Sequence, residues 1–183
     1  MATQASVAEL IAALGRVDGK AEIVDGEIVV MSPTGYAHNR SAGSIYVSLR
    51  QYERETRRGH ALSDNAGFVV DLPHRKSFSP DAAFYIGLPP GPGLLQAAPV
   101  FAVEVRSPDD YGPAAEKAIA AKRADYFAAG TAVVWDVDVL REAWIAVYRA
   151  TAPDRPTVYR RGEVAEAEPA LPGWTFPVVD LFD

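Results

Sequence analysis

The chain has 183 residues, 49% of them hydrophobic and 23% charged, which is enough for one globular domain with a hydrophobic core. It contains no cysteine, so disulfides, thiolate metal sites and a cysteine nucleophile are excluded. The net charge of −6 argues against a protein that holds nucleic acid by overall electrostatic attraction, although a local basic patch is still compatible with DNA binding. The N-terminal segment lacks the pattern of a signal peptide, and no apolar run reaches the roughly 18 residues of a membrane span, so we expect a cytoplasmic protein without membrane contact.

The first elements expected along the chain are a short helix, a hairpin and a long helix. The spacing of apolar residues in VAELIAALGR is helical. Two β-rich runs flank Asp25-Gly26, a dipeptide typical of tight hairpin turns. Residues 35–58 are predicted to form the long helix, because apolar residues recur there at intervals of four and three.

The rest of the chain is rich in strands, with one more helix. The β-rich runs, in chain order, are HALSDNAGFVVDL, FSPDAAFYIG, PVFAVEV, TAVVWDVD, AWIAVYRA and PTVYRRG. Between the third and the fourth run, a helix is predicted from Pro113 to Ala129, with Gly130 just after its end. Residues 87–93 are predicted to be a loop because they consist largely of proline and glycine. This order predicts an α/β (α+β) fold for residues 1–183, a single domain with a mixed central sheet flanked by helices.

One acidic residue stands inside the most apolar predicted strand. Glu104 interrupts PVFAVEV, and a buried carboxylate is costly unless a metal or another cation faces it. Asp81 opens the preceding apolar strand, so the two carboxylates converge if these strands are neighbours. Two close carboxylates repel unless a cation or a proton lies between them, and oxygen ligands favour a hard ion such as Mg²⁺. The alternative is an internal ion pair between Glu104 and Arg106 or another cation, since Arg106 shares its face of the strand.

Several segments, in this order, resemble a bacterial branch of the PD-(D/E)XK phosphodiesterase superfamily: SPDAAF, VFAVEVRSPDD and AAKRADYFAAGTAVVWDVD. Members of this branch are often labelled restriction endonucleases or proteins of unknown function. The resemblance covers nearly the whole chain, because the family's first hairpin and closing segment are similar to IVDGEIVVMSPTGYAHN and LPGWTFPVVDLF. It implies a restriction-endonuclease-like core and a cleavage of phosphodiester bonds that depends on Mg²⁺ or Mn²⁺.

The resemblance assigns roles to the two carboxylates and shows a change at the third position of the motif. Asp81 matches the Asp of the PD motif, and Glu104 matches the acidic residue of (D/E)XK, so both are implied metal ligands. Where the family has its lysine, this chain has Arg106. A guanidinium stays protonated and cannot act as a general base, but it can stabilise charge on a phosphate.

A replacement lysine is predicted on the helix that follows, where this branch often places it. On a helical wheel, Lys122 shares a stripe with Ile119 and Tyr126, whereas Lys117 falls on the opposite side and should face solvent. We interpret Lys122 as a catalytic cation that points over the sheet. We prefer it to Arg106 because a lysine in a desolvated site can also lose its proton. The alternative is that the Lys122 side chain extends to the surface.

Two further positions are candidates for the site. Glu27 follows the Asp25-Gly26 turn and is a candidate extra acidic ligand of the metal. His38 lies near the start of the first long helix, where the family often has a histidine. For both residues, a surface or capping role is an equal alternative.

The main functional hypothesis is a metal-dependent endonuclease that acts on DNA. A catalytically silent member of the fold that binds nucleic acid or a protein partner is the second hypothesis, because the net charge is acidic and Arg106 replaces the motif lysine. A hydrolase of small nucleotides is the third, since the sequence shows no helix-turn-helix, zinc finger or basic arm. A homodimer is expected from the family alone, because cutting two strands needs two sites.

Overall fold

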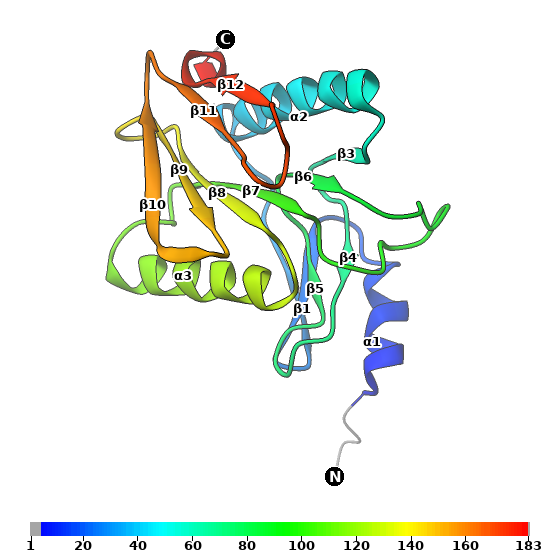
Figure 1. Ribbon diagram of the computed structural model, residues 1–183. Helices are drawn as coiled ribbons and strands as arrows, with labels where there is room; N and C mark the ends of the chain where they lie inside the picture. Colours follow the sequence, from blue (N-terminus) through cyan, green and yellow to red (C-terminus); the bar gives the residue numbers. More distant parts are fainter. Residues whose placement is uncertain (1–4, 183) are drawn as a thin grey trace.

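The computed structural model describes residues 5–182, which fold around a six-stranded mixed sheet (Figure 1). The helices are α1 Val7–Leu14, α2 Tyr36–Thr56, α3 Pro113–Ala128 and the short 3₁₀ helix η1 Val178–Phe182. The strands are β1 Ala21–Val24, β2 Glu27–Val30, β3 His60–Ser63, β4 Phe68–Val69, β5 Ser77–Phe78, β6 Ala82–Tyr85, β7 Phe101–Val105, β8 Val133–Asp138, β9 Trp144–Arg149, β10 Ala152–Arg160, β11 Val164–Glu166 and β12 Thr175–Pro177. The predicted α/β fold with a mixed central sheet is confirmed, and so are the two long helices.

The central sheet combines one parallel pair with antiparallel neighbours. Its strand order is β10-β9-β8-β7-β6-β3. β7 and β8 run parallel and are joined through α3, a crossover that parallel neighbours require. α2 and α3 lie on opposite faces of the sheet (Figure 1). The sheet therefore carries one long helix on each side.

The alternation of side chains along β7 separates the two faces. Val103 and Val105 belong to the hydrophobic core that includes the apolar side of α2. Ala102 belongs to a second core on the other face, together with Tyr126 of α3. Glu104 lies two residues after Ala102 and so shares its face, which directs the carboxylate toward α3.

The predicted hairpin is confirmed and attached to the rest of the fold by β1. β1 and β2 pair around the Asp25-Gly26 turn, where both residues have positive φ angles of 52° and 78°. On its other edge, β1 bonds to the segment around β5, because Ile23 accepts a hydrogen bond from the N–H of Lys76 and donates its own N–H to Ser77 Oγ. This attachment joins the β1 side of the hairpin to the small β4–β5 sheet.

Two of the predicted β-rich runs each divide into two strands. HALSDNAGFVVDL contains β3 and β4, which belong to different sheets, with Asn65 in a left-handed conformation between them. FSPDAAFYIG begins with Phe78, the last residue of β5, and then contains β6; Pro80, which has no N–H to donate to a ladder, lies between the two strands. The break at Pro80 leaves Asp81 at the start of β6.

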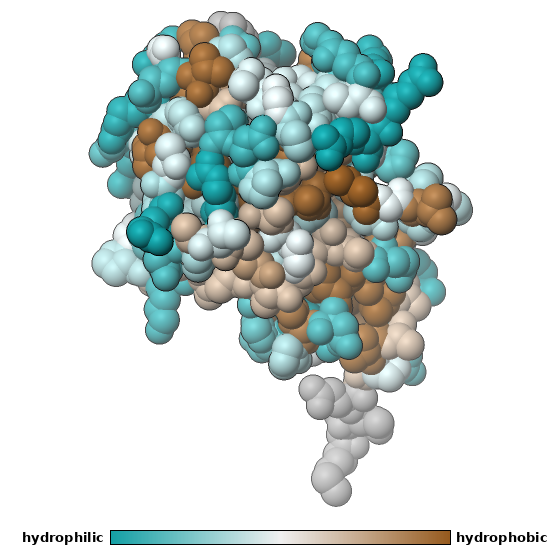
Figure 2. Space-filling model, in the orientation of Figure 1, coloured by the Kyte–Doolittle hydropathy of each residue, from teal (hydrophilic) through white to brown (hydrophobic). Residues whose placement is uncertain are grey.

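The surface seen in Figure 2 is mostly hydrophilic in its upper part, and hydrophobic residues gather lower, over α1. There α1 packs through Leu10, Ile11 and Leu14 against Ile23 of the hairpin. Within residues 5–182, no helix is long and apolar enough to cross a membrane.

Candidate active site

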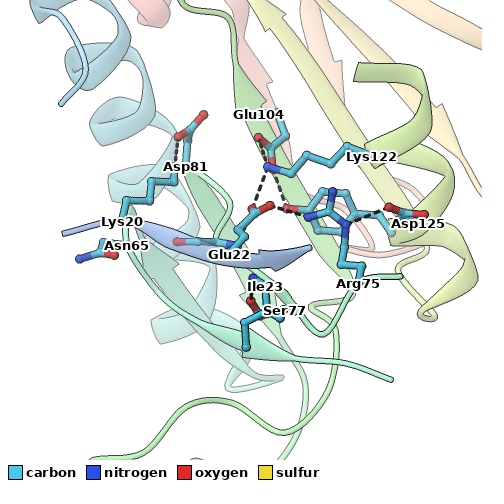
Figure 3. Close-up of polar contacts among 12 residues, drawn as sticks. Lys20, Glu22, Ile23, Asn65, Arg75, Ser77, Asp81, Glu104, Lys122 and Asp125 are labelled. Carbon is cyan, nitrogen blue, oxygen red and sulfur yellow. Dashed lines mark hydrogen bonds and ion pairs between the residues drawn. The ribbon is translucent and has the colours of Figure 1, made fainter. Parts of the chain in front are cut away.

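A cavity of about 560 Å³ lies where the start of β6, the end of β7, the start of α2 and the inner side of α3 meet. Its wall includes the expected residues Asp81, Glu104, Lys122 and His38, together with Lys20. Figure 3 shows the carboxylates of Asp81 and Glu104, each with a lysine side chain directed toward it. The fold thus brings together residues that are far apart in the sequence.

Asp81 and Glu104 are positioned by neighbouring antiparallel strands. Ala82 of β6 pairs with Val103 of β7, which puts Asp81 across from Glu104. The N–H of Asp81 donates to the carbonyl oxygen of Val103 at 3.0 Å, and the N–H of Val105 donates to Asp81 Oδ2 at 2.7 Å. The two strands are therefore neighbours, as the convergence of the carboxylates requires.

Asp81 is buried among positive groups. Its Oδ1 forms an ion pair with Lys20, and its Oδ2 lies 3.2 Å from Nε2 of His38. Burial by itself would raise the pKa of Asp81, but the hydrogen bond from His38 and the charge of Lys20 hold it well below its ordinary value. Asp81 is therefore ionised at neutral pH, and His38 is a direct neighbour of this carboxylate.

Glu104 has a different electrostatic environment. Nζ of Lys122 lies 2.9 Å from both of its carboxylate oxygens, and the hydroxyl of Tyr126 donates to Oε1 at 2.6 Å. Burial raises the pKa of Glu104, and the neighbouring charges of Asp81 and Glu22 raise it further, although Lys122 acts in the opposite direction. The side chain is still 26% exposed, toward the cavity. Burial is therefore the main cause that raises the pKa of this carboxylate, and it acts against the charge of Lys122.

Lys122 points inward from α3, as the sequence predicted from its stripe with Tyr126. Its ammonium forms ion pairs with Glu104 and with Glu22, both at 2.9 Å. Burial alone would lower the pKa of Lys122, but the two carboxylates raise it above its ordinary value. Lys122 is therefore a permanent cation in this environment, and the expected loss of its proton is not favoured. Lys117, on the opposite side of α3, is exposed as predicted.

Glu22 is a member of the cluster that the sequence analysis missed. It lies on β1, is only 4% exposed, and accepts hydrogen bonds from the N–H of Ser79 at 2.9 Å and from Arg75 at 2.5 Å. Lys122 and Arg75 hold the pKa of Glu22 below its ordinary value even though burial opposes this. The sequence could have indicated Glu22, because it is a charged residue within an apolar strand, as Glu104 is.

A chain of ion pairs continues from Glu22 to the surface. Arg75 bonds to Asp125 through Nε at 2.8 Å, and Asp125 also contacts Nε2 of His74 at 2.8 Å. Arg75 and Asp125 are buried, whereas half of the His74 side chain is exposed. This chain fixes Glu22, and through it the orientation of Lys122 (Figure 3).

Arg106 lies on the cavity wall but is bound elsewhere. Nε and Nη2 donate to the two oxygens of Asp136 at 2.8 Å each, and Nη1 and Nη2 bond to Glu116. The guanidinium carbon lies 5.0 Å from the ring centroid of Trp144. Arg106 thus pairs with Asp136 and Glu116 rather than with Glu104, whose cation is Lys122. The internal ion pair that the sequence analysis gave as the alternative for Glu104 is thus present, and its cation is Lys122.

Glu27, the candidate extra ligand, is exposed at the start of β2, just after the Asp25-Gly26 turn, and does not line the cavity. Its place in the cluster is taken by Glu22, which lies on the partner strand of the same hairpin. The correction has a simple cause. β1 bonds to the segment at β5 along the edge that does not pair with β2, whereas the side chain of Glu27 on β2 faces solvent.

The carboxylate oxygens at the site are suitable ligands for a hard divalent cation. Among the described residues, no group of three or more His, Asp or Glu side chains is arranged to hold a metal ion by itself. Mg²⁺, however, usually takes one or two carboxylates and completes its octahedron with water and phosphate oxygens. Asp81 and Glu104 supply two carboxylates on one cavity wall, and a bound cation would stabilise the charged form of Glu104, whose pKa is raised mainly by burial. The residues therefore fit the metal that the family implies.

The mixed sheet, with a parallel β7–β8 pair and acidic residues at the start of β6 and in β7, defines a restriction-endonuclease-like fold. A family model described as "Uma2: Putative restriction endonuclease" matches residues 8–179. The chain belongs to this family. A search among curated proteins found no match.

A solved structure supports the same fold. It is described as the crystal structure of "a putative nuclease belonging to DUF820 from Anabaena variabilis ATCC 29413". The TM-score is 0.72, and the alignment covers 91% of this chain and 93% of that chain at 17% sequence identity. At this identity the match is evidence for the shared architecture.

Proposed function

We propose that this chain is an endonuclease that hydrolyses phosphodiester bonds of DNA with the help of Mg²⁺ or Mn²⁺. The observation that carries the proposal is the placement of Asp81 across from Glu104 on antiparallel strands, on the wall of a cavity that Lys122 also lines. Membership of a restriction endonuclease family supports the reaction class. DNA as the substrate follows from that family description.

Asp81 and Glu104 would hold the metal. When bound, a divalent ion of this kind lowers the pKa of a water molecule and polarises a phosphoryl oxygen. The chain's own contribution is to keep both carboxylates in place. The N–H of Val105 fixes Asp81, and the hydroxyl of Tyr126 fixes Glu104.

Lys122 would serve as the fixed cation of the site. Its ammonium is charged and lies beside Glu104 on the cavity wall, so it can offset negative charge that develops on a phosphate during cleavage. The raised pKa of Lys122 argues for this electrostatic role over a role as general base. His38, next to Asp81, would orient that carboxylate.

The experiment is a cleavage assay on supercoiled plasmid and on single-stranded DNA, with Mg²⁺ and with EDTA. We expect cleavage only with metal, and roughly 100-fold or greater loss of rate for Asp81→Asn and for Glu104→Gln. The matched control is Glu27→Gln, an exposed carboxylate of the β1–β2 hairpin, which should keep the wild-type rate. Full activity of either site variant would contradict the proposal. DNA binding without cleavage by the wild type would instead identify a catalytically silent member of the fold.

A further inference from the structure

Lys20 is the second lysine of the cavity, and neither the motif nor the helical pattern indicated it. It is the last residue before β1, and its side chain is 13% exposed. Its ammonium contacts Asp81 Oδ1 and also Asp64 Oδ1, the latter at 2.8 Å. Burial would lower the pKa of Lys20, but Asp81 and Glu104 raise it above its ordinary value. Lys20 is therefore a charged group within the field of both proposed metal ligands (Figure 3).

Lys20 contacts Oδ1 of Asp81, the oxygen through which a metal would bind this carboxylate. Asp81 Oδ2 already accepts the N–H of Val105 and faces His38, so its lone pairs are used. Oδ1 has Lys20 as its partner. A divalent ion that binds Asp81 through Oδ1 therefore meets an ammonium on the same atom, and two cations repel each other.

The carboxylates of the cluster already have cationic partners before any metal binds. Three carboxylates, of Asp81, Glu104 and Glu22, face three cations. The three cations are Lys20, Lys122 and Arg75. A divalent ion at Asp81 and Glu104 would meet the ammonium groups of Lys20 and Lys122 there, so binding is easier if one of the two moves away.

Lys20 is the cation that can move at the lowest cost. The alternative partner of Lys122 is Glu22, which is deeply buried inside the same cluster. The alternative partner of Lys20 is Asp64, in the turn after β3, whose side chain is 31% exposed. An ammonium that leaves Asp81 for Asp64 stays paired and becomes better solvated.

We propose that Lys20, held between Asp81 and Asp64, competes with the divalent metal for Asp81 and is retained by Asp64 when the metal binds. This inference rests on the proposed metal site at Asp81 and Glu104. It makes Lys20 a determinant of metal affinity, and Asp64 a positioning residue that acts through Lys20.

The test is a titration of the DNA-free protein with Mn²⁺, in which the free ion is measured by electron paramagnetic resonance. Removing the competing charge in Lys20→Met should lower the Kd for Mn²⁺ about tenfold or more. Lys20→Arg keeps a charge beside Asp81 and should bind Mn²⁺ with close to wild-type affinity. Lys117→Met, which removes an exposed lysine of α3, is the matched control and should leave the Kd unchanged. Circular dichroism verifies that each variant is folded.

Asp64 provides an independent arm of the same experiment. Asp64→Asn should raise the Kd, because the displaced Lys20 loses its second partner. In a Lys20→Met background the same substitution should have a clearly smaller effect, which a double-mutant cycle measures.

The outcomes separate this inference from the proposed function. If the wild type binds Mn²⁺ and Lys20→Met binds it equally well or more weakly, the competition is wrong and the metal site stands. If wild type and Lys20→Met both fail to bind Mn²⁺, the metal site itself is wrong, and the inference falls with it.

Discussion

Two cations, Lys122 of α3 and Arg106, lie near the end of β7, and they contact different groups. Lys122 contacts two carboxylates, Glu104 and Glu22, on the wall of the cavity. Arg106 makes five hydrogen bonds, to Asp136, Glu116 and the carbonyl oxygen of Asp110, and so uses all five of its N–H donors. Aromatic rings of Tyr111 and Trp144 lie near its guanidinium.

The difference shows how the motif position has changed its role. A planar guanidinium with every donor engaged has none left for a phosphate, so Arg106 joins the ends of β7, β8 and the start of α3. A lysine ammonium is compact and rotates freely, so Lys122 can turn toward a ligand in the cavity while it keeps one carboxylate. The family motif has a lysine where this chain has Arg106, and the sequence analysis placed the replacement lysine on the following helix, where Lys122 lies beside Glu104.

The largest expected effect is a loss of protein stability when Arg106 is replaced. Arg106→Met leaves the buried carboxylate of Asp136 without its partner, and breaking such a pair costs about 3–5 kcal/mol of unfolding free energy. Urea unfolding measures this change. The control is Arg50→Met, which removes a surface ion pair with Glu53 and should leave the free energy of unfolding almost unchanged. Equal losses for both variants would show that Arg106 is not the structural cation described here.

The next effect separates them by activity. Lys122→Met removes the cation beside Glu104 and should lower the rate of single-turnover DNA cleavage about 100-fold, the effect expected when one stabiliser of transition-state charge is lost. Lys117→Met should stay close to the wild-type rate because its side chain is exposed on the other side of α3. A Lys122→Met protein that is folded and cuts DNA at the wild-type rate would pass the catalytic role to another cation.

The smallest effect contrasts the two carboxylates. Folding lowers the pKa of Asp81, so its stabilisation is present above its unfolded pKa of about 3.9 and is lost as the pH falls through the lower folded value. Folding raises the pKa of Glu104, so its charge opposes folding at neutral pH, and that penalty disappears as the pH falls toward about 4.3.

The two substitutions should therefore differ in their effect on stability at pH 7. Asp81→Asn should cost about 1–3 kcal/mol because charged hydrogen bonds are lost. Glu104→Gln should leave the free energy of unfolding unchanged or raise it by about 1 kcal/mol, as relief of strain at functional sites often does. Urea unfolding at pH 7 and at pH near 4 measures both, and a loss of similar size in the two variants would refute the contrast.

Much of the fold could be predicted from local pattern. The spacing of apolar residues predicted α2, Pro113 and Gly130 predicted the two ends of α3, and Asp25-Gly26 predicted the first hairpin. These signals depend only on neighbours in the sequence. Asp81 and Glu104 were identified because each is a carboxylate next to or within an apolar strand. Their neighbouring strands then followed from the family resemblance.

The remaining site residues depend on contacts between distant segments. Lys20 approaches Asp81 across 61 positions, and no local pattern indicates that contact. The engagement of Arg106 by Asp136 requires the parallel register of β7 and β8, which places Asp136 beside Glu104. Glu22 could have been identified in the same way as Glu104, as a carboxylate within an apolar strand. Glu27, on the other strand of that hairpin, was chosen instead because the sequence does not show which strand of the hairpin faces the sheet.

The most direct test of the account is a crystal structure of the protein with Mn²⁺, located by its anomalous scattering. We predict one Mn²⁺ bound to a carboxylate oxygen of Asp81 and one of Glu104, at distances close to the about 2.0–2.1 Å typical of such hard-ion ligands. In that structure Lys20 should contact Asp64 and Lys122 should stay beside Glu104. A crystal in which Mn²⁺ binds elsewhere, while Asp81 and Glu104 keep their lysine partners, would contradict the proposed metal site.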